Sequence, residues 1–288
     1  MPELPEVETI RRALASRITG KKFQRIVVDV PKMIQPLSVP ALQRRLRGKQ
    51  VTALHRRAKL LLISLSDNQT LAIHLKLSGQ LIFQPKAGLL VIGGHPQPGG
   101  LDNLPNKFTH IIFHFTDGSV LYFNDQRKFG WARLLDIDQT ARQIVDFGVD
   151  PLSSVFSLKH FTKVLRWYPN RAIKQTLLDQ KLFAGIGNIY ADESCFYAGV
   201  RPSRLVKSLT LAEIKKLHAG IPKILHQSIT KGGTSFALYR QADGTKGSFL
   251  PFLNVYGRQG LPCKRCGTPI KKTLVAQRGT SFCPTCQK

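Results

Sequence analysis

Acidic residues are scarce in this sequence. Among its 288 residues, 17 are Asp or Glu and 43 are Lys or Arg, so the formal net charge is +26 and the isoelectric point is near 10.3. A balance this basic attracts polyanions, and an isoelectric point above ~9 is typical of nucleic-acid-binding proteins. Binding to a membrane surface or to the ribosome is the alternative that composition leaves open. Two stretches contain no acidic residue at all: residues 44–59 hold seven basic residues, and residues 246–288 hold eight.

Two further features are missing, a long apolar run and a secretory signal. No stretch approaches the ~20 apolar residues that a membrane-spanning helix needs, and no signal sequence opens the chain. We therefore expect a cytoplasmic protein that does not enter a membrane. At ~150 residues per domain, 288 residues suggest about two domains. No exposed heptad or long apolar face calls for self-association, so we expect a monomer.

Cysteine is rare as well, and four of the five cysteines form two close pairs. The pattern C-x2-C-x16-C-x2-C suits two knuckles that fold four thiolates around one tetrahedral Zn²⁺, with Cys263, Cys266, Cys283 and Cys286 as ligands. Two disulfides are the alternative, but thiols stay reduced in the cytosol. Because all four ligands would be protein thiolates, the zinc is expected to be structural and to take no part in catalysis. The fifth cysteine, Cys195, falls in a helical pattern and is expected in the core.

The residue pattern changes from strand-like to helical and then to a short cysteine-bearing segment, which predicts an α+β multidomain protein. After an expected helix at Glu6–Ser16, short β-branched and aromatic runs predict an antiparallel β-sandwich or barrel. The periodicity is then helical from Leu158 to Lys231. The expected domains are residues 1–150, 151–245 and 246–288. The expected strands are Gln24–Val30, Lys59–Ser66, Thr70–Leu75, Gly79–Gln84, Phe108–Phe115 and Ser119–Asn124, and the expected helices are Leu158–Trp167, Ala172–Leu182, Asn188–Ala198, Leu211–Ala219 and Ile221–Thr230.

Two connecting segments carry their own predictions. Residues 87–106 are rich in Gly and Pro and predict a mobile surface loop. Between the cysteine pairs, Lys271–Arg278 and Thr280–Phe282 predict a β-hairpin with residues 277–279 at its tip. Such a tip could insert Arg278 into a nucleic-acid groove.

The start of the chain, PELPEVET, carries the main chemical signal. If Met1 is removed, the chain begins with the secondary amine of Pro2. An α-amino group titrates near ~8, so part of it is an unprotonated nucleophile at neutral pH. Its attack on a sugar carbon gives an iminium ion, which is an electron sink, and Glu3 beside it can donate or accept a proton. The alternative is that Pro5 and the glutamates merely begin a helix.

The segment Gly185–Glu193 is a candidate phosphate site. Two glycines permit a tight turn, and Asn188 suits the N-cap of the following helix, whose free N–H groups would bind phosphate. Lys174 could add a positive charge. A plain connection between two helices explains the same glycines, although the charge of the chain favours the phosphate site.

Together these motifs resemble the bacterial formamidopyrimidine-DNA glycosylases, bifunctional enzymes that remove oxidised purines from double-stranded DNA. The resemblance covers essentially the whole chain. It implies an N-terminal β-sandwich flanked by helices, a helix–two-turn–helix domain and a zinc-finger hairpin. It rests on PELPEVET, Arg56–Lys59, His74-Leu75 with Ser78-Gly79, Asn124–Gly130, Leu178–Gln180 running into GIGNIYADE, Lys231–Thr234, Val255–Arg258 and the four cysteines.

The resemblance also implies roles for single residues. Pro2 would be the nucleophile, Glu3 the general acid/base, Lys59 the proton donor in β-elimination and Arg278 the finger arginine that grips phosphates and assists δ-elimination. The base would be excised and the strand cut on both sides of the sugar. The damaged nucleotide would be turned out of the base stack, and a wedge of three side chains, Leu77, Arg127 and Phe129, would fill the space it leaves. Ordinary core packing is the alternative for Leu77 and Phe129. Lys174 and Asn188 would take phosphate-contact positions.

Several positions depart from the family pattern. Leu77 stands where methionine is usual, Lys76 replaces a glycine, and Phe108 replaces a DNA-contacting histidine, while His110 matches a neighbouring one. The loop expected to cap the flipped base is unusually apolar at Phe236–Leu238, which leaves the preference among oxidised purines open. Two rival functions are the sister glycosylase for oxidised pyrimidines and a non-catalytic zinc-finger DNA-binding protein. Leu4 and the pair Arg127 and Phe129 favour the purine enzyme.

Overall fold

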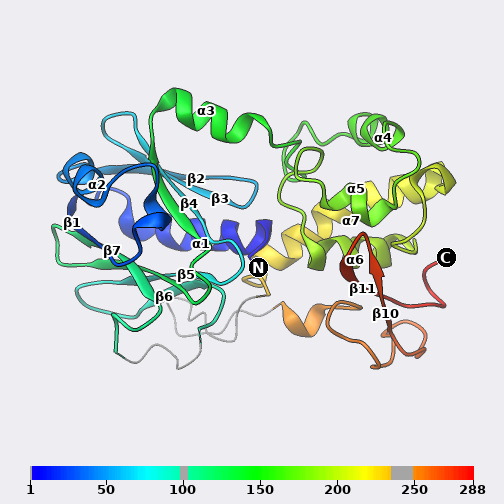
Figure 1. Cartoon of the computed structure of the whole chain (residues 1–288). Coiled ribbons are helices and arrows are strands. Elements are labelled where there is room, and N and C mark those ends of the chain that lie inside the picture. Colours follow the sequence, from blue (N-terminus) through cyan, green and yellow to red (C-terminus); the bar gives the residue numbers. More distant parts are fainter. Residues whose placement is uncertain (1, 98–102, 235–248) are drawn as a thin grey trace. The chain divides into compact units, whose positions relative to one another are not determined.

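The computed structural model describes residues 2–97, 103–234 and 249–288 (Figure 1). It separates into two compact units. Unit 1 comprises Met1–Val145 with Lys231–Ser248, and unit 2 comprises Asp146–Thr230 with Phe249–Lys288. The first boundary lies close to the expected one near residue 150. Residues 231–245, expected with the helical domain, belong to unit 1, and the cysteine-bearing segment shares a unit with the helices.

Unit 1 contains two antiparallel sheets. The five-stranded sheet has the order β1-β7-β8-β5-β6, and the four-stranded sheet has the order β2-β3-β4-β9. One core cluster draws buried side chains from both sheets and from the first helix, such as Ile63, Phe113 and Ile10. The predicted β-sandwich is therefore confirmed. The strands are β1 (Phe23–Val28), β2 (Val51–Arg57), β3 (Leu60–Leu65), β4 (Thr70–His74), β5 (Gly79–Gln84), β6 (Val91–Gly94), β7 (Thr109–Phe115), β8 (Val120–Asp125) and β9 (Trp131–Leu135).

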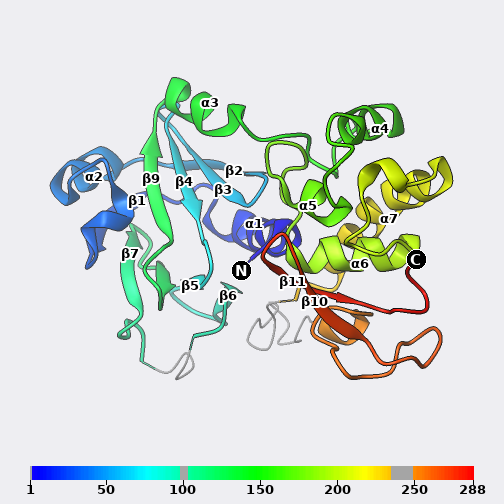
Figure 2. The same ribbon diagram turned by 45° about the vertical axis from the view of Figure 1, so that its right-hand side comes forward.

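Helix α1 (Leu4–Ile18) begins two residues earlier and ends two residues later than expected. Its apolar residues Val7, Ile10 and Leu14 enter the core of unit 1. Figure 2 shows α1 next to the two sheets. The unit also contains α2 (Val39–Leu46) and α3 (Ile137–Val145). The loop expected at residues 87–106 is wrong in part, because β6 lies within it and pairs with β5; residues 98–102 lie outside the described part of the chain.

Unit 2 contains α4 (Leu158–Arg166), α5 (Ile173–Leu178), α6 (Asn188–Ala198), α7 (Leu211–Thr230) and the hairpin of β10 (Lys271–Val275) and β11 (Arg278–Phe282). Two helices were expected where α7 runs unbroken, with Pro222 inside it. A proline removes one hydrogen bond from a helix. Here apolar side chains on both sides of Pro222, such as Ile221 and Leu225, are buried, and this packing stabilises one continuous helix. The hairpin tip is also corrected: Ala276 and Gln277 form the turn in the left-handed region, and Arg278 opens β11 opposite Val275.

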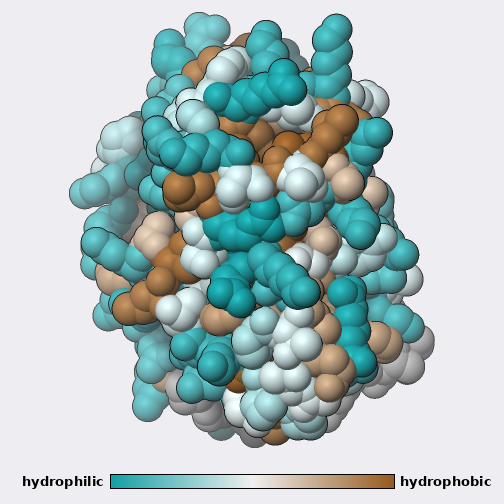
Figure 3. Space-filling model, turned by 90° about the vertical axis from the view of Figure 1, so that its right-hand side faces the viewer, coloured by the Kyte–Doolittle hydropathy of each residue, from teal (hydrophilic) through white to brown (hydrophobic). Residues whose placement is uncertain are grey.

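None of the described helices is both long and apolar enough to cross a bilayer. The face in Figure 3 carries many hydrophilic residues, interrupted by small apolar groups.

Candidate active site and nucleic-acid interface

Pro2 and Glu3 lie immediately before α1 and are both buried. Glu3 is the N-cap of the helix and is 2% exposed. The Glu3 N–H donates to Oε2 of Glu6 at 2.9 Å, which closes a capping box at the helix start. The helix-start explanation of the acidic residues is therefore correct for Glu6. It does not replace the chemical one, because the same capping box holds Pro2 and Glu3 in a fixed place.

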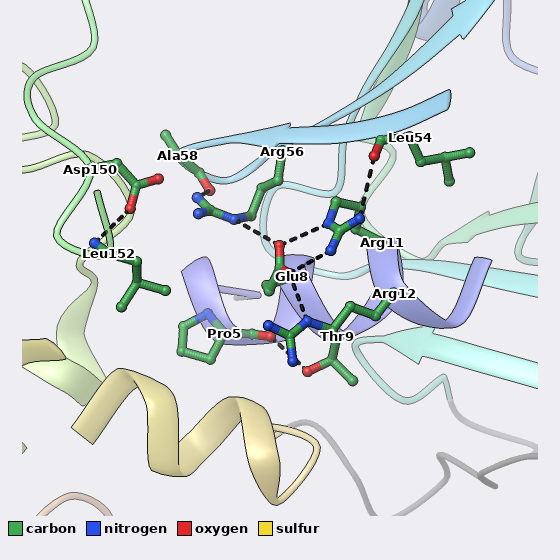
Figure 4. A network of polar contacts seen from close by, with 10 residues as sticks. All are labelled: Pro5, Glu8, Thr9, Arg11, Arg12, Leu54, Arg56, Ala58, Asp150 and Leu152. Carbon is green, nitrogen blue, oxygen red and sulfur yellow. Dashed lines mark hydrogen bonds and ion pairs between the residues drawn. The ribbon is translucent and has the colours of Figure 1, made fainter. Parts of the chain in front are cut away.

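An ion-pair network connects α1 with the turn that carries Lys59 (Figure 4). Oε1 of Glu8 accepts from Arg11 Nη2 and from Arg12 Nε, both at 2.8 Å, and Oε2 accepts from Arg56 Nε at 3.3 Å. Arg56 also donates through Nη1 to the Ala58 carbonyl at 2.9 Å. Lys59 follows directly and is 8% exposed. Glu8 therefore fixes the turn before Lys59 against the helix that begins beside Pro2.

The Glu8 network predicts a pH-dependent contribution to stability. Burial alone would raise the pKa of Glu8, but hydrogen bonds from Arg11 and Arg12 outweigh it and lower the pKa from 4.5 to about 2. A carboxyl group with a lowered pKa stabilises the fold above its unfolded pKa, and this stabilisation is lost as pH falls from 4.5 towards 2. We expect Glu8→Gln to lower the free energy of unfolding by about 2 kcal/mol at pH 7, allowing for partial exposure.

Urea denaturation of the wild type and of Glu8→Gln at pH 7, 4 and 3 measures this difference. Arg12→Gln is the matched control, because the Arg12 side chain is 58% exposed and its loss should cost less. A difference between wild type and Glu8→Gln that stays constant from pH 7 to pH 3 would contradict the prediction.

The three predicted wedge residues lie in two turns of unit 1. Leu77 is 37% exposed between β4 and β5, and Phe129 is 51% exposed between β8 and β9. The Arg127 guanidinium lies over the Phe129 ring at 5.0 Å from its centroid. Ordinary core packing is therefore wrong for both apolar residues. Their exposure leaves them available to enter a base stack.

Asp125, which is fully buried, joins the two wedge turns. Its Oδ1 accepts from the Ser78 hydroxyl and from the Arg127 N–H, and its Oδ2 accepts from the Gly130 N–H at 2.6 Å. His110, the histidine that matches the family pattern, lies 3.0 Å from the Asp125 carbonyl through Nε2. The segment that carries Arg127 and Phe129 is thus held at both ends by one carboxylate.

His74 is a site candidate that sequence reasoning placed in a motif without giving it a role. It pairs with Leu60 across β3 and β4, next to Lys59. Burial, assisted by Lys76 and Lys59, lowers its pKa to about 3. Its Nδ1 accepts from the Lys76 N–H at 2.9 Å, so the neutral ring holds the turn before Leu77. Lys76 itself has a φ of 51°, a left-handed conformation that explains why glycine suits this position.

In unit 2, Lys174, predicted at a phosphate contact, has a side chain that is 0% exposed and lies in a buried ion pair. Its Nζ lies 2.7 Å from Asp192 Oδ1 and donates to the Gly279 carbonyl at 2.9 Å and to Thr280 Oγ1 at 2.8 Å. Asp192 accepts in turn from the Ser281 N–H. The buried pair therefore docks β11 onto α5 and α6, immediately after Arg278, which is exposed.

Asn188 is half-buried and lies beside this docked strand. Its Nδ2 donates to the Gly279 carbonyl at 2.9 Å. It lines a depression of about 430 Å³ together with Tyr256, Lys272 and Ser281 among others. Asn188 is the first residue of α6, and Gly187 is its N-cap. The depression therefore combines a helix N-terminus with a lysine and an amide, which suits an anion. Tyr256 was missed as a site residue, although it lies in the Val255–Arg258 motif.

The pair of Lys174 and Asp192 predicts a large cost for removing one partner. Burial raises the pKa of Asp192 to about 6 even with Lys174 against it, so the carboxylate depends on the ammonium to stay charged. We expect Lys174→Met to cost about 3–5 kcal/mol of stability, with part of the loss recovered in the double variant Lys174→Met, Asp192→Asn. Thermal and urea unfolding of the two single variants and the double variant test this, and additive losses would contradict it.

The four paired cysteines meet in unit 2, with all their sulfur atoms within 4.8 Å of one another. Cys263 Sγ lies 4.0 Å from Cys286 Sγ, and Cys266 Sγ lies 3.5 Å from Cys283 Sγ. Four thiolates at ~2.3 Å from a tetrahedral Zn²⁺ are about 3.8 Å apart, so the observed spacing fits the ion. It is far beyond the ~2.05 Å of a disulfide, which rules out the alternative. Cys195 is fully buried, as expected.

The predicted capping loop at Phe236–Leu238 lies outside the described residues. Pro2, Glu3, Lys59 and the wedge residues all lie in unit 1, whereas Arg278, Asn188 and the cysteines lie in unit 2.

Comparisons with known proteins agree along the whole chain. Three family models match: the formamidopyrimidine-DNA glycosylase N-terminal domain at residues 1–132, the formamidopyrimidine-DNA glycosylase H2TH domain at residues 147–239, and the zinc finger found in FPG and IleRS at residues 260–288. A formamidopyrimidine-DNA glycosylase of Roseiflexus sp. (strain RS-1) is 42% identical over 289 residues, covering 100% of both chains.

Solved structures agree as well. A complex between the Lactococcus lactis Fpg and an abasic site containing DNA has a TM-score of 0.86 at 35% identity, covering 99% of both chains. A structure of MutM in complex with carbocyclic 8-oxo-G containing DNA has a TM-score of 0.86 at 36% identity, covering 100% of both chains.

Proposed function

The chain belongs to the formamidopyrimidine-DNA glycosylase family, and from this premise we propose how its residues carry out base-excision repair of oxidised purines. The protein is a DNA glycosylase with the abasic-site lyase activity of the family, and it carries one structural zinc. Its partner is double-stranded DNA that contains damaged bases. We propose that it acts as a monomer in the bacterial cytosol, on the nucleoid.

The first chemical step belongs to Pro2. After removal of Met1, its nitrogen attacks C1′ of the damaged nucleotide, and the bond from C1′ to the base breaks with its electron pair leaving on the base, which takes a proton. The nitrogen then loses its own proton, and the bond from C1′ to O4′ breaks with its electron pair leaving on O4′, which is protonated. The product is an iminium ion between Pro2 and the opened sugar. Glu3 is adjacent in sequence and buried beside the helix start, so it is suited to pass protons between the sugar and the departing base.

The iminium then draws electrons from C2′, whose proton is lost. In β-elimination the bond from C3′ to its oxygen breaks. In δ-elimination a second proton is lost, from C4′, and the bond from C5′ to its oxygen breaks. Each phosphate leaves as an anion, and water then frees Pro2. Lys59 is the proposed proton donor in β-elimination, and Arg278 the cation that stabilises the phosphates and assists δ-elimination.

Chemistry at C1′ requires the damaged nucleotide to leave the stack. We propose that Leu77, Arg127 and Phe129 fill the space it vacates. Their exposure and the rigid Asp125 network support this role. Asn188 would contact a phosphate at the start of α6, while Lys174 and Asp192 would position the strand that begins with Arg278.

The observation that carries the proposal is the burial of Pro2 and Glu3 at the start of α1, next to the network that holds the Lys59 turn. The test is to incubate the protein with duplex DNA that contains 8-oxoguanine and then add borohydride. A covalent protein–DNA adduct is expected, and a parallel reaction without borohydride should give strand products that end in phosphate on both sides of a one-nucleotide gap. No adduct would contradict the enzyme function and favour the non-catalytic DNA-binding protein.

A parallel duplex with an oxidised pyrimidine separates the sister glycosylase from the purine enzyme. Faster trapping on the pyrimidine duplex than on 8-oxoguanine would favour the sister enzyme.

A further inference from the structure

One buried carboxylate connects the start of the chain with a segment more than two hundred residues later. Glu6 is 1% exposed, and its Oε2 accepts the Glu3 N–H at 2.9 Å. Its other oxygen, Oε1, accepts two hydrogen bonds from Thr234, from the backbone N–H and from Oγ1, both at 2.9 Å. Thr234 is 7% exposed, and both residues belong to unit 1.

The arrangement requires a carboxylate. The Glu3 N–H donates to one oxygen of Glu6 and two Thr234 groups donate to the other, and a carboxylate accepts on both oxygens. A glutamine would turn its NH₂ group towards one of these donors and lose at least one contact. Hydrogen bonds to a charged acceptor are stronger than neutral ones, and a buried donor left without its acceptor is costly.

The chain on the Thr234 side is shaped to reach Glu6. Gly232 and Gly233 both have positive φ values, 82° and 88°, which glycine adopts readily. They follow the end of α7 at Thr230 and come directly before Thr234, which contacts Glu6 in α1. Thr234 therefore contacts the capping box that fixes Glu3, the residue next to the proposed nucleophile.

We propose that Glu6 is a positioning residue. It binds both Glu3 and Thr234, and so holds Pro2 and Glu3 in a fixed place relative to Thr234 before the amine attacks the sugar. The inference rests on the proposed function and adds a residue to it. Glu6 acts through Glu3 and Thr234 and does not itself need to touch the sugar.

The consequence is a coupling between two residues that are far apart in sequence. Loss of the Thr234 hydroxyl removes one of the two bonds to Oε1, so Thr234→Val should slow single-turnover excision of 8-oxoguanine about tenfold. Thr234→Ser keeps the hydroxyl and should restore the wild-type rate. Glu6→Gln should slow excision about 10- to 100-fold, with little change in DNA affinity.

The test is a double-mutant cycle on single-turnover excision and on the rate of borohydride trapping. If Glu6 and Thr234 act as one unit, Thr234→Val in the Glu6→Gln background adds less than about a twofold loss. Additive losses overturn the inference, as does a Glu6→Gln variant whose excision rate equals that of the wild type.

Thermal unfolding keeps a folding defect apart from a positioning defect. If Glu6→Gln does not fold, the Val and Ser variants at position 234 decide the question, since a Thr234→Ser rate as low as that of Thr234→Val also overturns the inference. Absence of trapping by the wild-type protein is a different result, which would contradict the proposed function itself.

Discussion

A chain whose Pro2 nitrogen is permanently blocked is expected to bind damaged DNA and to perform no chemistry on it. The lone pair of an amide nitrogen is delocalised into the peptide bond, so it cannot attack C1′. We expect the single-turnover rate to fall by ~10³-fold or more, which corresponds to a barrier higher by about 4 kcal/mol. A non-cleavable N-terminal extension produces the block, and trapping on 8-oxoguanine duplex measures the loss.

The matched control is the same extended chain with a protease site that releases Pro2 as the first residue. Cleavage should restore trapping and excision together, while the affinity for DNA stays constant before and after cleavage. An extended chain that still forms the borohydride adduct would contradict the assignment, because the adduct would then have to form on another amine.

The second large effect is expected on removal of the zinc. The cysteine-bearing segment shares a small core with Phe196 of α6; its own members are Val255, Ile270, Cys263 and Cys283, with Cys286 packed against them. Binding of structural zinc is worth ~10–16 kcal/mol in small zinc domains and becomes folding energy. Without it the β10–β11 hairpin should unfold and Arg278 lose its position. We expect DNA affinity to fall more than ~100-fold in an electrophoretic mobility-shift assay.

Two controls make this experiment specific. Cys195→Ala removes the one cysteine outside the cluster and should keep DNA affinity, whereas Cys283→Ala should lose it. The chain has two tryptophans, Trp131 in unit 1 and Trp167 in unit 2, so a Trp167→Phe background reports on unit 1 alone. Its fluorescence should not change on chelation. Wild-type affinity in the metal-free protein, or loss of the Trp131 signal with the metal, would contradict the prediction.

Local patterns predicted much of this molecule. The alternation in Phe108–Phe115 placed Ile111, Phe113 and Phe115 on one face, and all three are fully buried. The helix expected at Asn188–Ala198 has those bounds, because its glycine turn and N-terminal signals are local. The four cysteines specified their cluster by spacing alone.

Long-range pairing explains most of what the sequence could not predict. Strand β2 was not predicted, because the basic residues of the run 44–59 hide the alternation of apolar and polar residues that marks a strand. The charge of Arg56 is balanced by Glu8, which lies 48 residues away in the sequence. Lys174 was predicted to contact a phosphate, and nothing local indicated its partner Asp192 or the β11 carbonyl that it binds, because tertiary packing brings both to it. Glu6 was visible only as a helix-start acid, since nothing local indicates Thr234.

The most direct test of the account is to locate the trapped sugar. The borohydride adduct with 8-oxoguanine duplex is digested with protease and nuclease, and the modified peptide is sequenced by mass spectrometry. The account predicts one modified peptide, which begins at Pro2 and carries the deoxyribose remnant on its N-terminal nitrogen. A remnant on a lysine such as Lys59, or an active enzyme that retains Met1, would show that the proposed mechanism is wrong.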